Sequence, residues 1–133
     1  MRIQIINGPN INLLGKREPS IYGSVTFEEY LGELRKKYPD VELGYFQSNV
    51  EGEMIDKIQQ TGFDVDGIIL NAGAYTHTSS ALQDAIRSVP SPVIEDYKEN
   101  QSLYFGVCGW LNIQYRGSGN SYSKFPEEKI NIG

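Results

Sequence analysis

Hydrophobic and polar positions follow two alternating patterns along the first part of the chain. Apolar runs of strand length lie at residues 3–6, 41–46, 65–70 and 92–94. Segments with apolar residues at helical spacing lie between them, at residues 27–38, 51–60 and 79–89. This alternation of strands and helices predicts a parallel sheet with helices on both faces. We therefore expect an α/β fold, a flavodoxin-like doubly wound parallel sheet.

Two of the predicted helices have boundary signals. Thr26 is followed three residues later by Glu29, which is the spacing of a helix capping box, and Pro39 closes this first helix. The second helix ends just before Gly62, a residue type that commonly follows a helix end in the left-handed conformation. These signals sharpen the limits of the elements without changing their order.

The loops that follow the predicted strands all open on the same edge of the sheet. In open α/β sheets this is the edge where ligands bind. The loop at residues 71–79 is the richest, because it holds an amide, small residues, hydroxyls and His77, the single histidine of the chain. We expect His77 at the start of the third helix, where backbone N–H groups can hold an anion. The alternative is that His77 is an ordinary structural histidine.

Length and charge narrow the class of protein. A chain of 133 residues is predicted to form one domain. A net charge of -5 and a pI of about 4.8 argue against a surface for nucleic acid or an anionic membrane. Cys108 is the single cysteine, so no disulfide can form within the chain, which fits a cytoplasmic protein. The apolar run at the amino terminus is too short to predict a signal peptide or a membrane span.

Several common site motifs are absent from the sequence. There is no Cys-x-x-Cys pair and no second histidine, which argues against a zinc site. There is also no Gly-rich phosphate loop or dinucleotide fingerprint.

The long loop at residues 7–25 contains an arginine and a tyrosine that could form an acid–base pair. A tyrosine acts as a base near neutral pH only if its pKa falls from about 10 to about 7, which takes roughly 4 kcal/mol. Arg17 lies five residues before Tyr22, and a guanidinium favours the phenolate. The alternative is a packed tyrosine and a surface arginine. Asn10 and Asn12 in the same loop either form a tight turn or orient a hydroxyl or a water.

Three segments together resemble a known family, type II 3-dehydroquinate dehydratase. They are residues 6–19 with Tyr22-Gly23, residues 46–49 with Glu51-Gly52, and residues 71–79. The resemblance implies a flavodoxin-like fold, a cytoplasmic dodecamer of trimers, and no metal or organic cofactor. It also implies a small-molecule substrate, 3-dehydroquinate, which the family dehydrates through an enolate to 3-dehydroshikimate in the shikimate pathway. No nucleic-acid or membrane partner is expected.

The resemblance also implies roles for residues. Tyr22 would take the proton next to the substrate carbonyl, and Arg17 would lower the pKa of Tyr22. Asn10 would help to hold a water that stabilises the enolate. Residues that would bind the substrate are Asn71, His77 and Asp84, of which Asp84 would reach the substrate of its own or a neighbouring subunit. From its sequence position alone, Asp84 is a solvated helix charge.

The resemblance covers residues 1–95, and residues 96–133 form a divergent tail of the same single domain. Tyr97 stands where the family has its general-acid histidine. Lys98 and Glu99 stand where the family backbone grips the substrate carboxylate. The tail reflects a frameshift, a chimera or a genuine adaptation. Two functional hypotheses follow: a dehydratase, or an impaired or non-catalytic relative that binds ligand or co-assembles with an active homologue.

Overall fold

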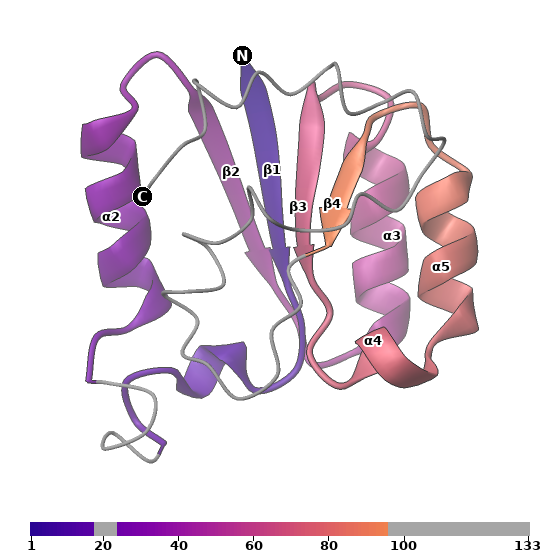
Figure 1. Ribbon diagram of the computed structural model, residues 1–133, viewed down its shortest axis with the longest axis horizontal. Helices are drawn as coiled ribbons and strands as arrows, with labels where there is room; N and C mark the ends of the chain where they lie inside the picture. The colour runs from indigo at the N-terminus through magenta and orange to yellow at the C-terminus, as the bar shows by residue number, and fades with distance from the viewer. Residues whose placement is uncertain (18–23, 96–133) are drawn as a thin grey trace.

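A computed structural model of the protein describes residues 1–17 and 24–95. The elements in chain order are β1 (Arg2–Asn7), η1 (Ile11–Leu13), α2 (Phe27–Lys37), β2 (Glu42–Gln47), α3 (Glu51–Thr61), β3 (Gly67–Asn71), α4 (Tyr75–Thr78), α5 (Ser80–Arg87) and β4 (Val93–Glu95). The four strands form a parallel sheet in the order β2-β1-β3-β4 (Figure 1). This is the beginning of the flavodoxin-like strand order, and it confirms the predicted fold class.

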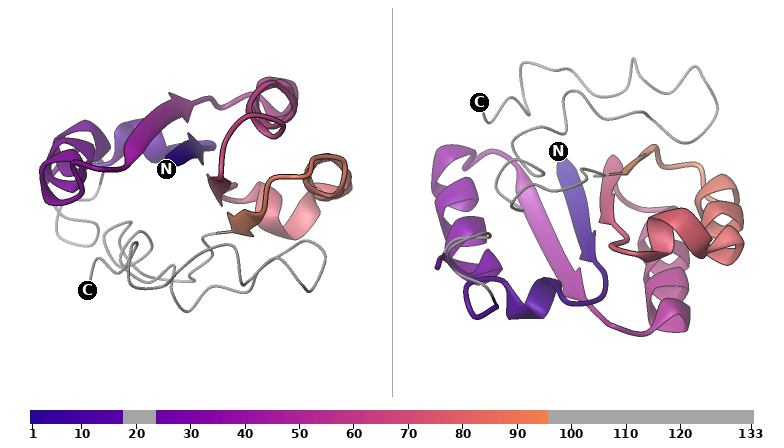
Figure 2. Two further views of the ribbon diagram at one scale, coloured as in Figure 1. Left: turned by 90° about the horizontal axis from the view of Figure 1, so that it is seen from above. Right: turned by 60° about the horizontal axis from the view of Figure 1, so that its bottom comes forward.

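Helices cover both faces of the sheet, and the alternation of side chains along each strand explains why. Ile3 and Ile5 of β1 pack with the apolar residues of α2, whereas Ile6 packs with those of α3 and α5. β3 alternates in the same way, with Ile69 on the α2 side. Figures 1 and 2 show α2 on one side of the sheet and α3 with α5 on the other. The nearly continuous apolar run of β3 is the signature of a strand buried on both faces.

β2 is one edge strand of the described sheet, and a charged side chain covers part of it. The guanidinium Nη2 of Arg35, on α2, donates to the backbone carbonyl of Leu43 at 2.7 Å. The side chains along β2 are only partly buried, in contrast to those of β1. The edge of the sheet is therefore joined to its helix by a polar contact as well as by apolar packing.

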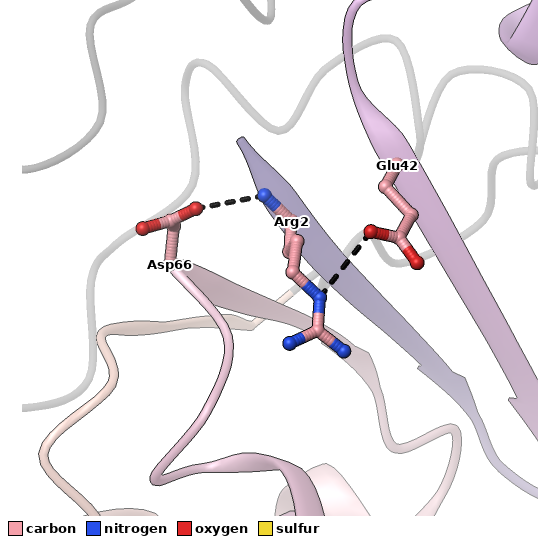
Figure 3. A network of polar contacts seen from close by, with 3 residues as sticks. All are labelled: Arg2, Glu42 and Asp66. Atoms are coloured by element: carbon pink, nitrogen blue, oxygen red, sulfur yellow. Dashed lines mark hydrogen bonds and ion pairs between the residues drawn. The ribbon is translucent and has the colours of Figure 1, made fainter.

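The amino-terminal edge of the sheet has its own polar contacts, shown in Figure 3. The backbone N–H of Arg2 donates to Oδ2 of Asp66 at 2.7 Å. The side-chain Nε of Arg2 lies 3.3 Å from Oε2 of Glu42, but both side chains are exposed. An exposed ion pair of this kind adds roughly 0–1 kcal/mol to stability. These contacts join β1, β2 and the residue before β3 at the amino-terminal end of the strands.

The helix boundaries follow the sequence prediction with one correction. Oγ1 of Thr26 accepts from the N–H of Glu29 at 3.2 Å, so the predicted cap of α2 is confirmed. Gly62 does cap α3, but its φ is -66°, so it does not adopt the predicted left-handed conformation. A Cβ at Gly62 would instead lie 2.5 Å from Cβ of Val89. Glycine is required there because α3 and the segment after α5 approach closely.

Within residues 1–17 and 24–95, no helix has the length and apolar content needed to cross a membrane.

Candidate active site

Three amide side chains lie in one row at the carboxyl edge of the sheet. The strand register pairs Asn7 with Gln47 of β2 and with Asn71 of β3. Figure 1 shows that β1, β2 and β3 end at the same edge, next to α4. Asn7 is buried, whereas Gln47 and Asn71 are partly exposed. The predicted ligand edge is thus lined by groups that both donate and accept hydrogen bonds.

The loop after β1 turns sharply across this edge. The N–H of Gly8 donates to the backbone carbonyl of Asn71 at 2.7 Å, which extends the pairing of β1 and β3 by one residue. Asn10 then adopts the left-handed conformation, with a φ of 73°, and starts η1. Asparagine is one of the few residues other than glycine that enter this region readily. The turn interpretation of Asn10 is therefore correct, and Asn10 is also exposed at the site edge.

Side chains from the loop after β2 hold this turn in place. Nε2 of Gln47 donates to the carbonyl of Gly8 at 3.1 Å and to Oδ1 of Asn49 at 3.2 Å. A longer contact of 3.4 Å joins the same nitrogen to Oδ1 of Asn12. Oδ1 of Asn49 also accepts from the backbone N–H of Asn10 at 3.0 Å. The loops after β1 and β2 are thus one hydrogen-bonded unit.

The loop after β3 is tightly turned as well. Oδ1 of Asn71 accepts from the N–H of Gly73 at 3.3 Å, and Gly73 has a φ of 60°. The side-chain oxygen of Asn71 is therefore turned back onto its own loop. Its amide nitrogen remains the group that could bind a ligand hydroxyl.

The position of His77 differs from the predicted one. His77 lies inside the separate four-residue helix α4, whereas α5 starts after Ser79. Oγ of Ser79 accepts from the N–H of Leu82 at 2.9 Å and caps α5. The prediction that His77 stands at the start of the third helix is wrong, because Ser79 breaks the backbone path between the two helices. His77 is exposed, next to the carboxyl edge of the sheet.

Arg17 and Asp84 are both exposed. The N–H of Arg17 donates to the carbonyl of Leu13 at 3.0 Å, so Arg17 lies in the turn that follows η1. Asp84 lies on α5, and its backbone carbonyl accepts from Oγ of Ser88 at 2.7 Å. The other predicted site residues lie outside the described residues: Tyr22, Tyr97, Lys98 and Glu99.

A polar spot lies beneath the row of amides, on the α2 side of the sheet. The amide nitrogen of Asn7 and the hydroxyl of Tyr45 are both buried next to each other, and neither makes a hydrogen bond of good geometry within the described ranges. Burial raises the pKa of Tyr45 above its usual value of 10.0, and the nearby carboxylate of Glu28 raises it further. Hydrogen bonding to the neighbouring Asn7 side chain acts in the opposite direction and lowers the pKa. The Tyr45 phenol is therefore kept neutral, so it cannot serve as a base.

Acidic, histidine and cysteine side chains do not gather in groups of three or more that could hold a metal ion in the part of the chain that the structure describes. The chemistry available at this edge is that of amides, an imidazole, a guanidinium and backbone N–H groups. Such groups orient hydroxyls and stabilise developing negative charge on oxygen.

Comparison with known proteins identifies the family. The model of the family "Dehydroquinase class II" matches residues 1–100. The chain belongs to the class II dehydroquinase family. The match extends five residues beyond the predicted limit of 95.

Relatives of known name support the same assignment. A 3-dehydroquinate dehydratase of an Exiguobacterium species is 52% identical over 101 residues, which cover 75% of this chain and 69% of the relative. A second 3-dehydroquinate dehydratase, from Prochlorococcus marinus, is 54% identical over 102 residues, or 75% of this chain and 70% of the relative.

Solved dehydroquinase structures share the fold. The type II dehydroquinase of Butyrivibrio crossotus superposes with a TM-score of 0.66 at 46% identity, over 71% of this chain and 68% of that chain. The type II dehydroquinase of Propionibacterium acnes gives a TM-score of 0.65 at 31% identity, over 71% of this chain and 66% of that chain.

Sequence reasoning assigned no role to Gln47 and Asn49. Both lie directly after the second predicted strand, at the edge already expected to bind a ligand. That placement was the available signal. Their contacts with Gly8 and Asn10 span 39 residues of sequence, so no local pattern reveals them.

Proposed function

We propose that this chain is a hydro-lyase that dehydrates 3-dehydroquinate to 3-dehydroshikimate through an enolate. The observation that carries the proposal is the family match over residues 1–100, which spans the loops after β1, β2 and β3. The amide-rich edge supports it, because a cyclic polyhydroxy acid is recognised by groups that both donate and accept hydrogen bonds.

The first step removes a proton from the carbon next to the substrate carbonyl. Tyr22, as phenolate, forms the new O–H bond, and the electrons of the broken C–H bond move onto the carbonyl oxygen. Arg17 favours the phenolate by its fixed positive charge. Asn10 holds a water that donates to the enolate oxygen, where donors aimed at developing charge lower the barrier.

The second step expels the leaving hydroxyl. The enolate electrons return to form the carbon–carbon double bond, the C–O bond breaks, and the hydroxyl leaves as water after accepting a proton. Asn71 and His77 hold substrate hydroxyls, and Asp84 contacts substrate in its own or a neighbouring subunit. Tyr97 occupies the proton-donor position, with Lys98 and Glu99 at the carboxylate-binding positions. The proposed reaction belongs to the shikimate pathway. The proposed location is the cytoplasm, and the proposed assembly is a dodecamer of trimers.

The test uses purified full-length protein and 3-dehydroquinate, with formation of the conjugated enone followed by absorbance. Turnover that is lost in Tyr22→Phe supports the proposal, because the variant removes the base. Tyr38→Phe is the matched control, since Tyr38 packs on the α2 side of the core and caps α2 at its far end. Absence of turnover in the unmodified protein at high enzyme concentration, or full turnover in Tyr22→Phe, would overturn it.

Assembly is measured separately by light scattering coupled to size exclusion. A mass near twelve times 14.9 kDa supports the dodecamer. A monomer at micromolar concentration contradicts that part of the proposal and leaves the chemistry standing.

A further inference from the structure

The loop after β2 supplies two side chains that hold the turn at Asn10 and belong to no assigned role. Asn10 adopts the left-handed conformation, which a residue with a Cβ holds only when its surroundings favour it. Its backbone N–H has one partner in the described chain, Oδ1 of Asn49 at 3.0 Å. The conformation of Asn10 therefore depends on where Asn49 points.

Gln47 in turn orients Asn49. The side-chain nitrogen of Gln47 carries two hydrogens and faces three acceptors, the carbonyl of Gly8 at 3.1 Å, Oδ1 of Asn49 at 3.2 Å and Oδ1 of Asn12 at 3.4 Å. The two shorter contacts are the stronger ones. They fix Gly8, which is buried, and they select the orientation in which Asn49 turns its oxygen toward Asn10.

The base of this network is rigid. Gly8 is bonded through its N–H to the carbonyl of Asn71, and the N–H of Ser48 donates to the carbonyl of Asn7 at 3.0 Å. Oγ of Ser48 accepts from the N–H of Val50 at 2.9 Å, so the loop after β2 is tied to the start of α3. The hydrogen bonds of Gln47 and Asn49 therefore connect the loop after β1 to the sheet and to the start of α3.

We propose that Gln47 and Asn49 are positioning residues, which hold Asn10 in its left-handed conformation and so place its side chain for the enolate-stabilising water. The inference rests on the proposed function for its catalytic consequence. Neither residue touches substrate; both act through Asn10.

Two isosteric variants separate this role from a general effect of charge. Asn49→Asp keeps an oxygen that accepts from both Asn10 and Gln47, so the network is retained. Gln47→Glu replaces the donor by a carboxylate, which faces the carbonyl oxygen of Gly8 and turns the amide of Asn49 the wrong way for Asn10. Each variant adds one negative charge at the same edge. A difference in activity or amide exchange between the two variants is therefore due to the hydrogen bonds and not to the charge.

The first readout is catalytic. We expect Gln47→Glu to lower kcat by roughly 10- to 100-fold with a smaller change in KM, because the lost interaction stabilises the transition state. Asn49→Asp is expected to stay close to the unmodified protein. Equal losses of kcat in both variants would overturn the inference.

The second readout needs no turnover. Exchange of the Asn10 backbone amide with deuterium, followed by NMR, is expected to accelerate about tenfold or more in Gln47→Glu and to stay unchanged in Asn49→Asp. If the unmodified protein has no activity, the proposed function fails. Amide exchange alone then tests whether Gln47 and Asn49 hold Asn10 in its conformation. Unchanged exchange in Gln47→Glu would refute it.

A third variant tests the same network if Gln47→Glu does not fold. Asn49 is exposed, so Asn49→Leu removes the acceptor for Asn10 without placing a charge beside Gly8. It carries the same expectation as Gln47→Glu in both readouts. Thermal unfolding of each variant confirms that the comparison is made between folded proteins.

Discussion

The ring of Tyr45 stacks on the ring of Phe27, with 4.8 Å between the ring centroids and an angle of 26° between the planes. This contact joins β2 to the first residue of α2 and leaves the Tyr45 hydroxyl buried, with no hydrogen bond of good geometry among the residues described. An unpaired buried hydroxyl costs about 1–3 kcal/mol of stability. The stack therefore carries both a stabilising and a destabilising contribution.

Removing the hydroxyl is expected to stabilise the protein. Tyr45→Phe keeps the stack with Phe27 and removes the desolvated oxygen, so the free energy of unfolding at pH 7 should rise by about 1 kcal/mol. Urea-induced unfolding of the two proteins measures the difference. A loss of stability would mean that a water or another part of the chain satisfies the hydroxyl.

The same variant should change the response to alkaline pH. Because the pKa of Tyr45 is raised in the folded protein, the unfolded chain ionises first and binds fewer protons. Ionisation of Tyr45 therefore leaves the free energy of unfolding unchanged below about pH 10 and lowers it as the pH rises through the folded pKa. Unfolding free energies measured between pH 8 and pH 11 should therefore fall more steeply for the unmodified protein than for Tyr45→Phe. Parallel curves would contradict this assignment.

Gly62 is expected to tolerate no side chain. In Gly62→Ala, the new Cβ would lie 2.5 Å from Cβ of Val89 and 2.6 Å from the carbonyl oxygen of Ile58, so α3 and the segment after α5 must separate. We expect a loss of about 1–3 kcal/mol in the free energy of unfolding.

Gly32 provides the matched control for this prediction. It lies within α2, and among residues 1–17 and 24–95 a Cβ there would meet no atom within 4 Å outside the helix backbone. Gly32→Ala should stabilise the protein by about 0.5–1 kcal/mol, since alanine favours the helix. Equal effects of the two substitutions in thermal unfolding would show that close approach is not what selects Gly62.

Ser79 separates the helix that carries His77 from α5. Its hydroxyl is buried and accepts from the N–H of Leu82, so Ser79→Ala should cost about 1–2 kcal/mol in unfolding free energy. The adjacent Ser80 is exposed, and Ser80→Ala should change stability by less than about 0.5 kcal/mol. Denaturant unfolding of both variants tests the cap, and a comparable effect at the two positions would count against it.

Tyr97 is predicted to limit the second step of the proposed reaction. An imidazole has a pKa of about 6.5 and donates a proton near neutral pH far more readily than a phenol with a pKa of about 10. We expect Tyr97→His to raise the rate of dehydration by about 100-fold or more. The rate of enone formation measures this change.

Proton exchange distinguishes the two steps. If proton removal by Tyr22 is intact and hydroxyl loss is slow, the α-proton of 3-dehydroquinate should exchange with deuterium faster than enone forms, as followed by NMR. Tyr97→Phe should leave this exchange unchanged. A Tyr97→His variant that gains no dehydration rate, although exchange proceeds, would show that another group supplies the proton.

The strands and helices were predictable because their signals are local. β3 is a continuous apolar run, and Thr26 sets the start of α2 through a contact three residues away. The placement of Asn10, Asn71 and His77 at one edge also followed from the pattern, because every parallel strand ends on the same side. The short helix α4 was missed, because its four residues lie in the segment 71–79 that the sequence pattern predicts as a loop.

The remaining features depend on contacts between distant residues. Glycine is needed at position 62 because the side chain of Val89 lies too close for a Cβ there. The orientation of Asn10 is set by its hydrogen bond with the side chain of Asn49. Neither pair is close in sequence, so neither leaves a periodic signal. The roles of Tyr22, Tyr97, Lys98 and Glu99 rest on resemblance and stay predictions.

The contact between Arg35 and the carbonyl of Leu43 bears on how the protein behaves at high concentration. An exposed sheet edge offers backbone donors and acceptors to the strands of other molecules, and such pairing starts aggregation. The guanidinium occupies one acceptor on this edge and places a charge beside it. A strand of another molecule that paired with β2 would have to displace this guanidinium, and its charge would then lie next to an apolar interface. Arg35 is therefore expected to disfavour the pairing of β2 with strands of other molecules.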